Sequence, residues 1–224
     1  MTSSLSHYPL LAALFRYPDA AYPGRAQAAQ AALERTHPEA AEALRPFTRF
    51  VADAAPVTLE ELYTRSFDVQ AVTTLDLGYV LFGDDYKRGA MLVHLNREHA
   101  AAGNPCHGEL ADHLPNVLRL LPLMTDEALR AELVARIVLP ALHKMIDDFD
   151  PEKMARKKKV YLKHHRTWIE QPEGYGTLYR LPLLAVRAAL EADFGAREAA
   201  PPPATSDFLR NIGTEIVLEA DSKA

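Results

Sequence analysis

A short stretch of the sequence gathers side chains that could carry chemistry. Its sulfur, imidazole and carboxylate groups belong to Cys106, His107, Glu109 and His113, with His94 and His99 just upstream. A structural zinc site usually presents ligands in close pairs, such as two cysteines two residues apart, and that spacing is absent. A nucleophilic thiol needs a base held by a third group, which one loop cysteine does not provide. We expect neither a metal site nor a catalytic centre here.

A second candidate is the basic run at residues 156–166. Its lysine, arginine and histidine side chains, with Tyr161 and Trp168 nearby, could bind the phosphates of a nucleotide or RNA. Four acidic residues precede the run, however, and the formal net charge is −5, which disfavours a nucleic-acid partner. A solvated helix face is the simpler interpretation, and phosphate binding remains the alternative.

The third candidate is the segment at residues 109–115, Glu-Leu-Ala-Asp-His-Leu-Pro. Asp112 has the position of a helix N-cap, which is worth about 1 kcal/mol, and Pro115 would fall in the first turn of that helix. Glu109, Asp112 and His113 also lie beside an apolar run. A cationic, partly apolar peptide could therefore bind here in the helix-in-groove mode.

Helices must position these groups, because apolar residues recur at helical spacing along most of the chain. A capping box of Thr58 and Glu61 is expected to start one helix, Asp84 or Asp85 and Thr125 to cap two others, and Gly103 to end one. The predicted helical segments are 6–16, 23–36, 38–54, 58–67, a short helix within 68–83, 84–103, 112–124, 125–149 with a kink at Pro140, 151–170 and 178–194.

We therefore expect an all-α fold: a single-domain bundle of about nine helices over residues 1–195. Residues 196–224 are Pro-rich and polar and predict an extended or flexible tail. The one cysteine excludes an internal disulfide and fits a reducing compartment. With no signal peptide pattern and no apolar run of about 20 residues, we expect a cytoplasmic protein without a membrane span.

The same residues carry a resemblance to a known family. They are, in order, Leu62-Tyr63, Phe67-Asp68, Arg88-Gly89, Leu95, Gly103 and the segment 109–115. In this order of residues the sequence resembles the nitrate reductase delta-subunit chaperones. These are related to the maturation chaperones of dimethyl-sulfoxide and trimethylamine-oxide reductases. The similarity covers residues 58–124.

The resemblance implies a non-catalytic chaperone that binds the N-terminal leader of a molybdoenzyme catalytic subunit of the dimethyl-sulfoxide reductase family. Such a chaperone assists cofactor insertion, assembly and export proofreading. The client, not the chaperone, carries the bis-molybdopterin guanine dinucleotide. The chaperone itself is expected to be a monomer or weak homodimer that binds no nucleic acid. A helical adaptor subunit is a further alternative.

By this resemblance Asp112 and His113 line the peptide site, and the residue pattern adds apolar neighbours. The complete predicted set is Tyr63, Phe67, Phe82, Glu109, Asp112, His113, Leu114, Pro115 and Leu118. Apolar contacts should dominate affinity, because exposed ion pairs contribute only about 0–1 kcal/mol each. On this view Asp112→Ala weakens client binding without much unfolding, and Phe67→Ala or Leu118→Ala weakens it more than Glu109→Ala.

Overall fold

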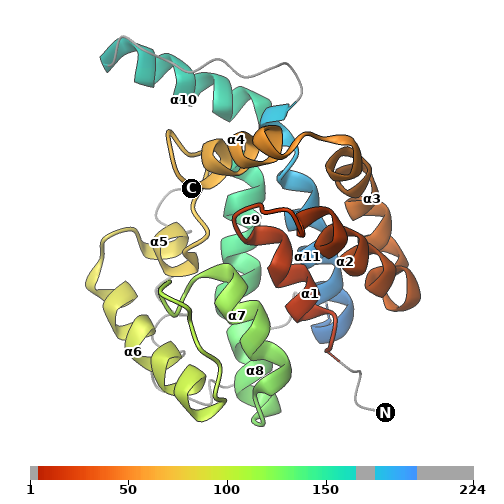
Figure 1. Ribbon diagram of the computed structural model, residues 1–224. Coiled ribbons are helices and arrows are strands. Elements are labelled where there is room, and N and C mark those ends of the chain that lie inside the picture. The colour runs from red at the N-terminus through yellow and green to blue at the C-terminus, as the bar shows by residue number, and fades with distance from the viewer. Residues whose placement is uncertain (1–4, 165–174, 196–224) are drawn as a thin grey trace.

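The computed structural model describes residues 5–164 and 175–195, and their regular structure is helical with no strand (Figure 1). Among them, nine α-helices have seven residues or more, which confirms the all-α prediction. The α-helices are α1 (Tyr8–Ala12), α2 (Tyr22–Thr36), α3 (Pro38–Asp53), α4 (Pro56–Phe67), α5 (Leu77–Phe82), α6 (Tyr86–Ala101), α7 (Leu114–Leu120), α8 (Glu127–Leu133), α9 (Leu139–Asp148), α10 (Pro151–His164) and α11 (Arg180–Phe194). The predicted tail at residues 196–224, and Trp168, lie outside the described residues.

Several helices begin differently from the sequence prediction. The capping box of Thr58 and Glu61 is wrong, because α4 already begins at Pro56, where the missing N–H of proline costs nothing. Asp126, not Thr125, caps α8 by accepting a hydrogen bond from the Leu129 N–H. Asp85 caps α6 as expected. Near Pro140 the helix widens into a π-helical turn, Val134–Val138, before α9 begins.

One continuous hydrophobic core joins the first and last described helices, from Tyr8 to Leu190. Helix α11 packs on both α3 and α9, while α5 and α6 lie on the other side of α7 to α9, and α10 projects from the bundle (Figure 1). Phe67 lies at an aromatic centre of this core, with ring contacts to Phe15, Tyr63, Phe149 and Tyr179. The shared core is what a single-domain bundle requires.

No described helix combines the length and the apolar character needed to cross a bilayer.

Candidate functional site

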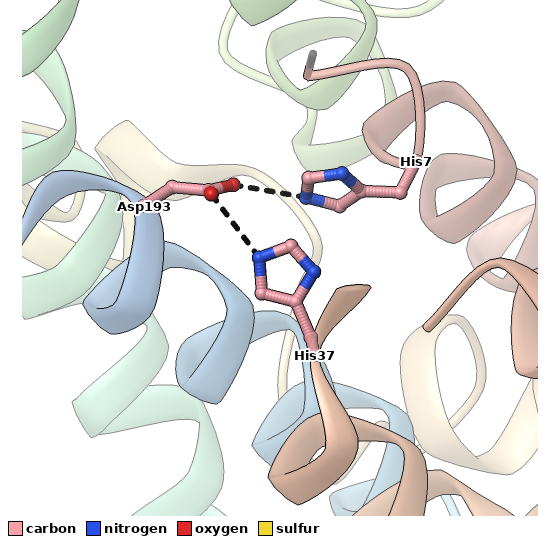
Figure 2. A group of neighbouring side chains, drawn as sticks. All are labelled: His7, His37 and Asp193. Atoms are coloured by element: carbon pink, nitrogen blue, oxygen red, sulfur yellow. Dashed lines mark hydrogen bonds and ion pairs between the residues drawn. The ribbon is translucent and has the colours of Figure 1, made fainter. Parts of the chain in front are cut away.

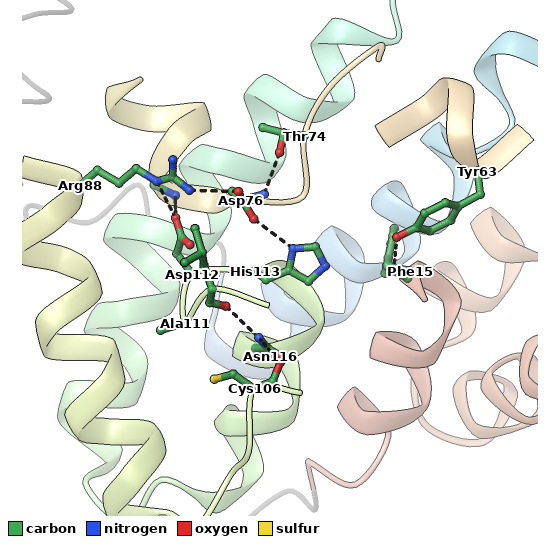
Figure 3. Close-up of polar contacts among 12 residues, drawn as sticks. Phe15, Tyr63, Thr74, Asp76, Arg88, Cys106, Ala111, Asp112, His113 and Asn116 are labelled. Atoms are coloured by element: carbon green, nitrogen blue, oxygen red, sulfur yellow. Dashed lines mark hydrogen bonds and ion pairs between the residues drawn. The ribbon is translucent and has the colours of Figure 1, made fainter. Parts of the chain in front are cut away.

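Asp112 lies at a corner between α5, α6 and the start of α7, and its side chain is fully buried. Its Oδ2 accepts hydrogen bonds from the Gly78 N–H at 3.0 Å and from the Arg88 Nε–H at 3.2 Å (Figure 3). The residue before α7 is His113, which makes no side-chain capping bond. The prediction that Asp112 caps its own helix is therefore wrong: it satisfies an N-terminal donor of α5 instead.

Gly78 permits this contact because it has no side chain. A Cβ at this position would lie 2.8 Å from Asp112 Oδ2 and would also clash with the Met91 side chain. The N-terminus of α5 can therefore reach the carboxylate and pack closely on α6. Segment 68–83, which gave the weakest sequence pattern, thus contributes a close helix contact.

Arg88 connects Asp112 to a second carboxylate. Its Nη2 donates to Asp76 Oδ2 at 3.0 Å, and the other Asp76 oxygen lies 3.0 Å from His113 Nδ1 (Figure 3). The backbone joins the same two segments, because the Leu77 N–H donates to the Asp112 carbonyl and the Leu114 N–H to the Leu75 carbonyl. We call Asp76, Arg88, Asp112 and His113 the corner network.

The two carboxylates of the corner network have pKa values displaced in opposite directions. Burial, followed by the nearby charge of Asp76, raises the pKa of Asp112, although Arg88 and the Gly78 N–H oppose this. The hydrogen bond from His113 is the largest cause of the lowered pKa of Asp76, with Arg88 adding to it. The network therefore stabilises the ionised form of Asp76 more than that of Asp112.

Replacing Asp76 with asparagine should flatten the acid side of the stability curve. A carboxylate with a lowered folded-state pKa stabilises the fold above its unfolded pKa of about 3.9, and this contribution is lost as the pH falls through the folded-state value. Asp112 has the opposite effect on stability, and it acts at pH values above the unfolded pKa. Because its folded-state pKa is raised, the folded state binds a proton at a higher pH than the unfolded state does. Urea unfolding from pH 6 to pH 2.5 measures the slope. Equal slopes for wild type and Asp76→Asn, with the exposed Asp53→Asn as control, would contradict this role.

Buried amides hold the loop between α6 and α7. Asn104 Nδ2 donates to the Asn116 carbonyl at 3.0 Å and lies 2.9 Å from His99 Nδ1. Because the amide donates, His99 Nδ1 accepts and its Nε2–H donates to the Ala111 carbonyl, 3.0 Å away. Burial lowers the pKa of His99. His99 is therefore a satisfied core histidine, and the sequence pattern did not single out Asn104 or Asn116.

Six of the nine predicted peptide-contacting residues lie in the core: Tyr63, Phe67, Asp112, Leu114, Pro115 and Leu118. Phe82 and His113 are partly buried, and Glu109 is exposed. The predicted apolar groove is therefore not open in this conformation, because its side chains pack against other helices. The corner network, rather than a groove, is what the structure builds from the motif residues.

An exposed surface beside this corner carries both charge and apolar groups. We call it the acidic rim: Tyr17, Asp68, Val69, Glu109 and Leu110. The Tyr17 ring packs edge-on against the Tyr63 ring, with the ring centroids 5.4 Å apart. Burial raises the pKa of Asp68, the charge of Glu109 raises it further, and His113 opposes the shift. The two rim carboxylates are thus close enough to repel each other. Tyr17, Val69 and Leu110 each expose about half of their surface.

Cys106 does not have the environment of an activated thiol. It is partly buried, and this burial raises the pKa of its thiol, with Arg119 acting in the opposite direction. Activation requires a lowered pKa. Arg119 instead donates to the Pro105 carbonyl at 2.7 Å and to Asn116 Oδ1, so these groups support the loop.

Two of the described lysines at the start of α10, Lys153 and Lys157, make internal contacts. Lys157 Nζ donates to the carbonyls of Ala71 and Val72 at 3.1 and 2.6 Å, and Lys153 pairs with Asp147. A pocket of about 430 Å³ lies beside them, and its charged lining residues are Lys144, Asp147, Asp148, Lys153 and Lys157. The lining carries three lysines and two aspartates. Lys153 and Lys157 already have internal partners, so little positive charge is left for a phosphate. The side chain of Lys158 and those from Val160 to Trp168 lie outside the described residues.

In comparisons with known proteins, no family model matches the chain, and no curated protein matches it significantly.

Proposed function

We propose that this protein is a maturation chaperone that binds the N-terminal leader of a molybdoenzyme catalytic subunit and keeps it unassembled until the cofactor is inserted. The proposal is that the acidic rim contacts the basic part of the leader. The corner network acts behind it, because it fixes the loop that carries Glu109. The chaperone itself uses no cofactor in this role.

The observation that carries the proposal is the pair of neighbouring carboxylates, Asp68 and Glu109, among half-exposed apolar side chains. Their mutual repulsion raises the pKa of Asp68 beyond the effect of burial, and a bound cationic side chain would relieve that repulsion. Arginine suits this position because its planar guanidinium can bind carboxylates with two hydrogen bonds. Leader peptides with arginines next to apolar residues match both properties of the rim.

The motif residues named for the family resemblance support the same location. These residues are distant in sequence but converge behind the rim. They are Tyr63 and Phe67 from α4, Arg88 from α6, and Asp112 and His113 before α7. An affinity near 1 μM corresponds to about −8 kcal/mol. Exposed ion pairs give at most about 1 kcal/mol each, so Tyr17, Val69 and Leu110 must supply apolar contacts as well.

Charge reversal at the rim should weaken client capture. Asp68→Lys and Glu109→Lys are each expected to reduce the affinity for the client leader about tenfold, since an attractive exposed pair worth up to about 1 kcal/mol becomes repulsive. The matched control is Glu42→Lys on α3, whose side chain is 67% exposed. The tagged full-length protein is first used to recover its client from native cytoplasm, and the client's N-terminal peptide is then titrated by calorimetry.

The recovered partners separate this function from its alternatives. Recovery of a molybdoenzyme precursor that still carries its leader supports the chaperone. A protein that remains in the mature enzyme complex would instead be an adaptor subunit. Recovery of RNA, together with a higher melting temperature of the protein in phosphate, would instead support phosphate binding by the basic run at residues 156–166. If the rim variants and the α3 control bind the leader equally, the rim is not the site.

A further inference from the structure

Two histidines and a carboxylate converge from three helix ends (Figure 2). His7 precedes α1, His37 lies between α2 and α3, and Asp193 lies in the last turn of α11. His7 Nε2 is 3.0 Å from Asp193 Oδ2, and His37 Nε2 is 3.1 Å from Asp193 Oδ1. The three ligand-type atoms all lie within 4.8 Å of one another.

The cluster is buried, and one of its atoms lacks a proper hydrogen bond. The side chains of His7, His37 and Asp193 are only 4%, 6% and 6% exposed. His7 Nε2 is close to the Asp193 carboxylate, yet it makes no hydrogen bond of acceptable geometry. A buried polar atom without a hydrogen-bond partner destabilises the folded state. A bound cation between the two groups would remove this destabilisation.

The hydrogen bonds around His37 also allow its Nε2 atom to act as a metal ligand. The Thr36 hydroxyl donates to the Ala32 carbonyl at 3.1 Å, so its oxygen can accept a hydrogen bond from His37 Nδ1, 2.7 Å away. In the tautomer with the proton on Nδ1, the Nε2 lone pair faces Asp193 Oδ1, 3.1 Å away, as a metal ligand requires. In the tautomer with the proton on Nε2, the same contact is an ordinary hydrogen bond.

The Asp193 carboxylate is also held by a hydrogen bond. The Tyr8 hydroxyl donates to Asp193 Oδ2 at 2.9 Å. In metal sites, histidine ligands usually donate their second ring N–H to a neighbouring group, and carboxylate ligands are themselves hydrogen-bonded. Thr36 and Tyr8 occupy these two outer positions. The arrangement therefore includes both potential ligands and the groups that orient them.

We infer that His7, His37 and Asp193 form a binding site for one divalent first-row transition-metal ion. Ligand atoms about 2.0–2.2 Å from a common ion lie close to 3 Å apart when the angles at the ion are near 90°. The separations from His7 Nε2 to Asp193 Oδ2 and from His37 Nε2 to Asp193 Oδ1 agree with this value for a carboxylate that binds the ion through both oxygens. Two imidazoles and one carboxylate suit Zn²⁺ and Fe²⁺. Three protein ligands leave further coordination positions for water or another group.

The site would connect chain segments that are far apart. His37 and Asp193 are separated by 156 positions in sequence, and His7 lies still further from Asp193. A metal that binds only the folded arrangement stabilises it by mass action. Bound metal would thus hold the start of α1 and the α2–α3 junction against the end of α11.

The test uses the full-length protein without an affinity tag, after removal of metal by a chelator. Calorimetric titration with Zn²⁺ is expected to show one site per chain, and saturating Zn²⁺ to raise the melting temperature. His37→Gln and Asp193→Asn should each weaken Zn²⁺ binding at least about 100-fold, since loss of outer-shell partners alone typically costs 10- to 100-fold. His143→Gln, which changes a histidine that is 56% exposed on α9, is the matched control and should bind like wild type.

Two further measurements decide the result even if a cluster variant fails to fold. Thr36→Val changes an exposed residue and removes the hydroxyl beside His37 Nδ1, so it should weaken binding about tenfold while the fold is retained. The Co²⁺ spectrum of the wild type should show ligand-field bands without the thiolate charge-transfer band that Cys106 would give. Anaerobic competition between Fe²⁺ and Zn²⁺ identifies the preferred ion.

Several results would overturn the site. The first is a wild type that binds neither ion at 1 mM. The second is equal affinity in folded wild type and Asp193→Asn, and the third is a thiolate band in the Co²⁺ spectrum. The cluster would then be a proton-linked histidine–carboxylate contact only.

Discussion

Replacing Asp112 with alanine is expected to lower the free energy of unfolding by about 3 kcal/mol. Breaking a buried ion pair by removing one partner typically costs about 3–5 kcal/mol, and here the N-terminal N–H of Gly78 also loses its acceptor. The lower end of the range applies because Arg88 keeps its contact with Asp76 and because the buried carboxylate is itself partly destabilised, as its raised pKa indicates. Urea unfolding followed by circular dichroism measures the change.

The matched control for Asp112 is its exposed neighbour Glu109. Glu109→Ala should change stability by less than about 0.5 kcal/mol. Asp112→Asn keeps an oxygen that can accept from Gly78 and should lose less stability than Asp112→Ala. A variant Asp112→Ala that folds like wild type but no longer binds its client would restore the sequence-based expectation, in which this side chain contacts the peptide directly.

Phe67→Ala is expected to lower the free energy of unfolding by about 3–5 kcal/mol, the range typical of buried phenylalanine truncations. Phe67 is 8% exposed, and its ring contacts four other aromatic rings, the nearest being Tyr179 with centroids 4.8 Å apart. Its removal would leave a cavity in the middle of the core. Thermal and urea unfolding of the full-length protein measure this loss.

Val69, two residues further along, provides the control for Phe67. Its side chain is 51% exposed, so Val69→Ala should leave stability within about 0.5 kcal/mol of wild type, while Phe67→Ala should not. The sequence pattern led us to expect that Phe67→Ala or Leu118→Ala would act mainly on peptide binding. Stability unchanged in Phe67→Ala, with client binding lost, would mean that the ring leaves the core to meet the peptide.

These variants separate two functions of the motif at residues 109–115. Asp112 and Leu114 have no exposed side-chain surface and hold the corner together, whereas Glu109 and Leu110 face solvent. Loss of binding with intact stability is expected only from the second group. The motif therefore combines a structural half and a half that is available to a partner.

Local sequence determined the helices and most of their ends. Apolar spacing of three and four residues reports burial on one helix face, and proline or glycine at the termini acts through the conformation of a single residue, as at Gly103, whose φ is +61°. The exceptions were caps, such as Asp126 in place of Thr125, because neighbouring residues can compete for the same few orphan N–H groups.

Tertiary structure alone decided which polar groups meet. Asp112 has the sequence context of a local cap, but Gly78, 34 positions earlier, offers a buried donor instead. His7, His37 and Asp193 have no metal-ligand spacing in the sequence, and they come together only in the tertiary structure, where α11 packs against α3 and α1 packs against α2. Helical periodicity specifies which face of each helix is buried. It does not specify which helix covers that face, and the chemistry of this protein depends on those pairings.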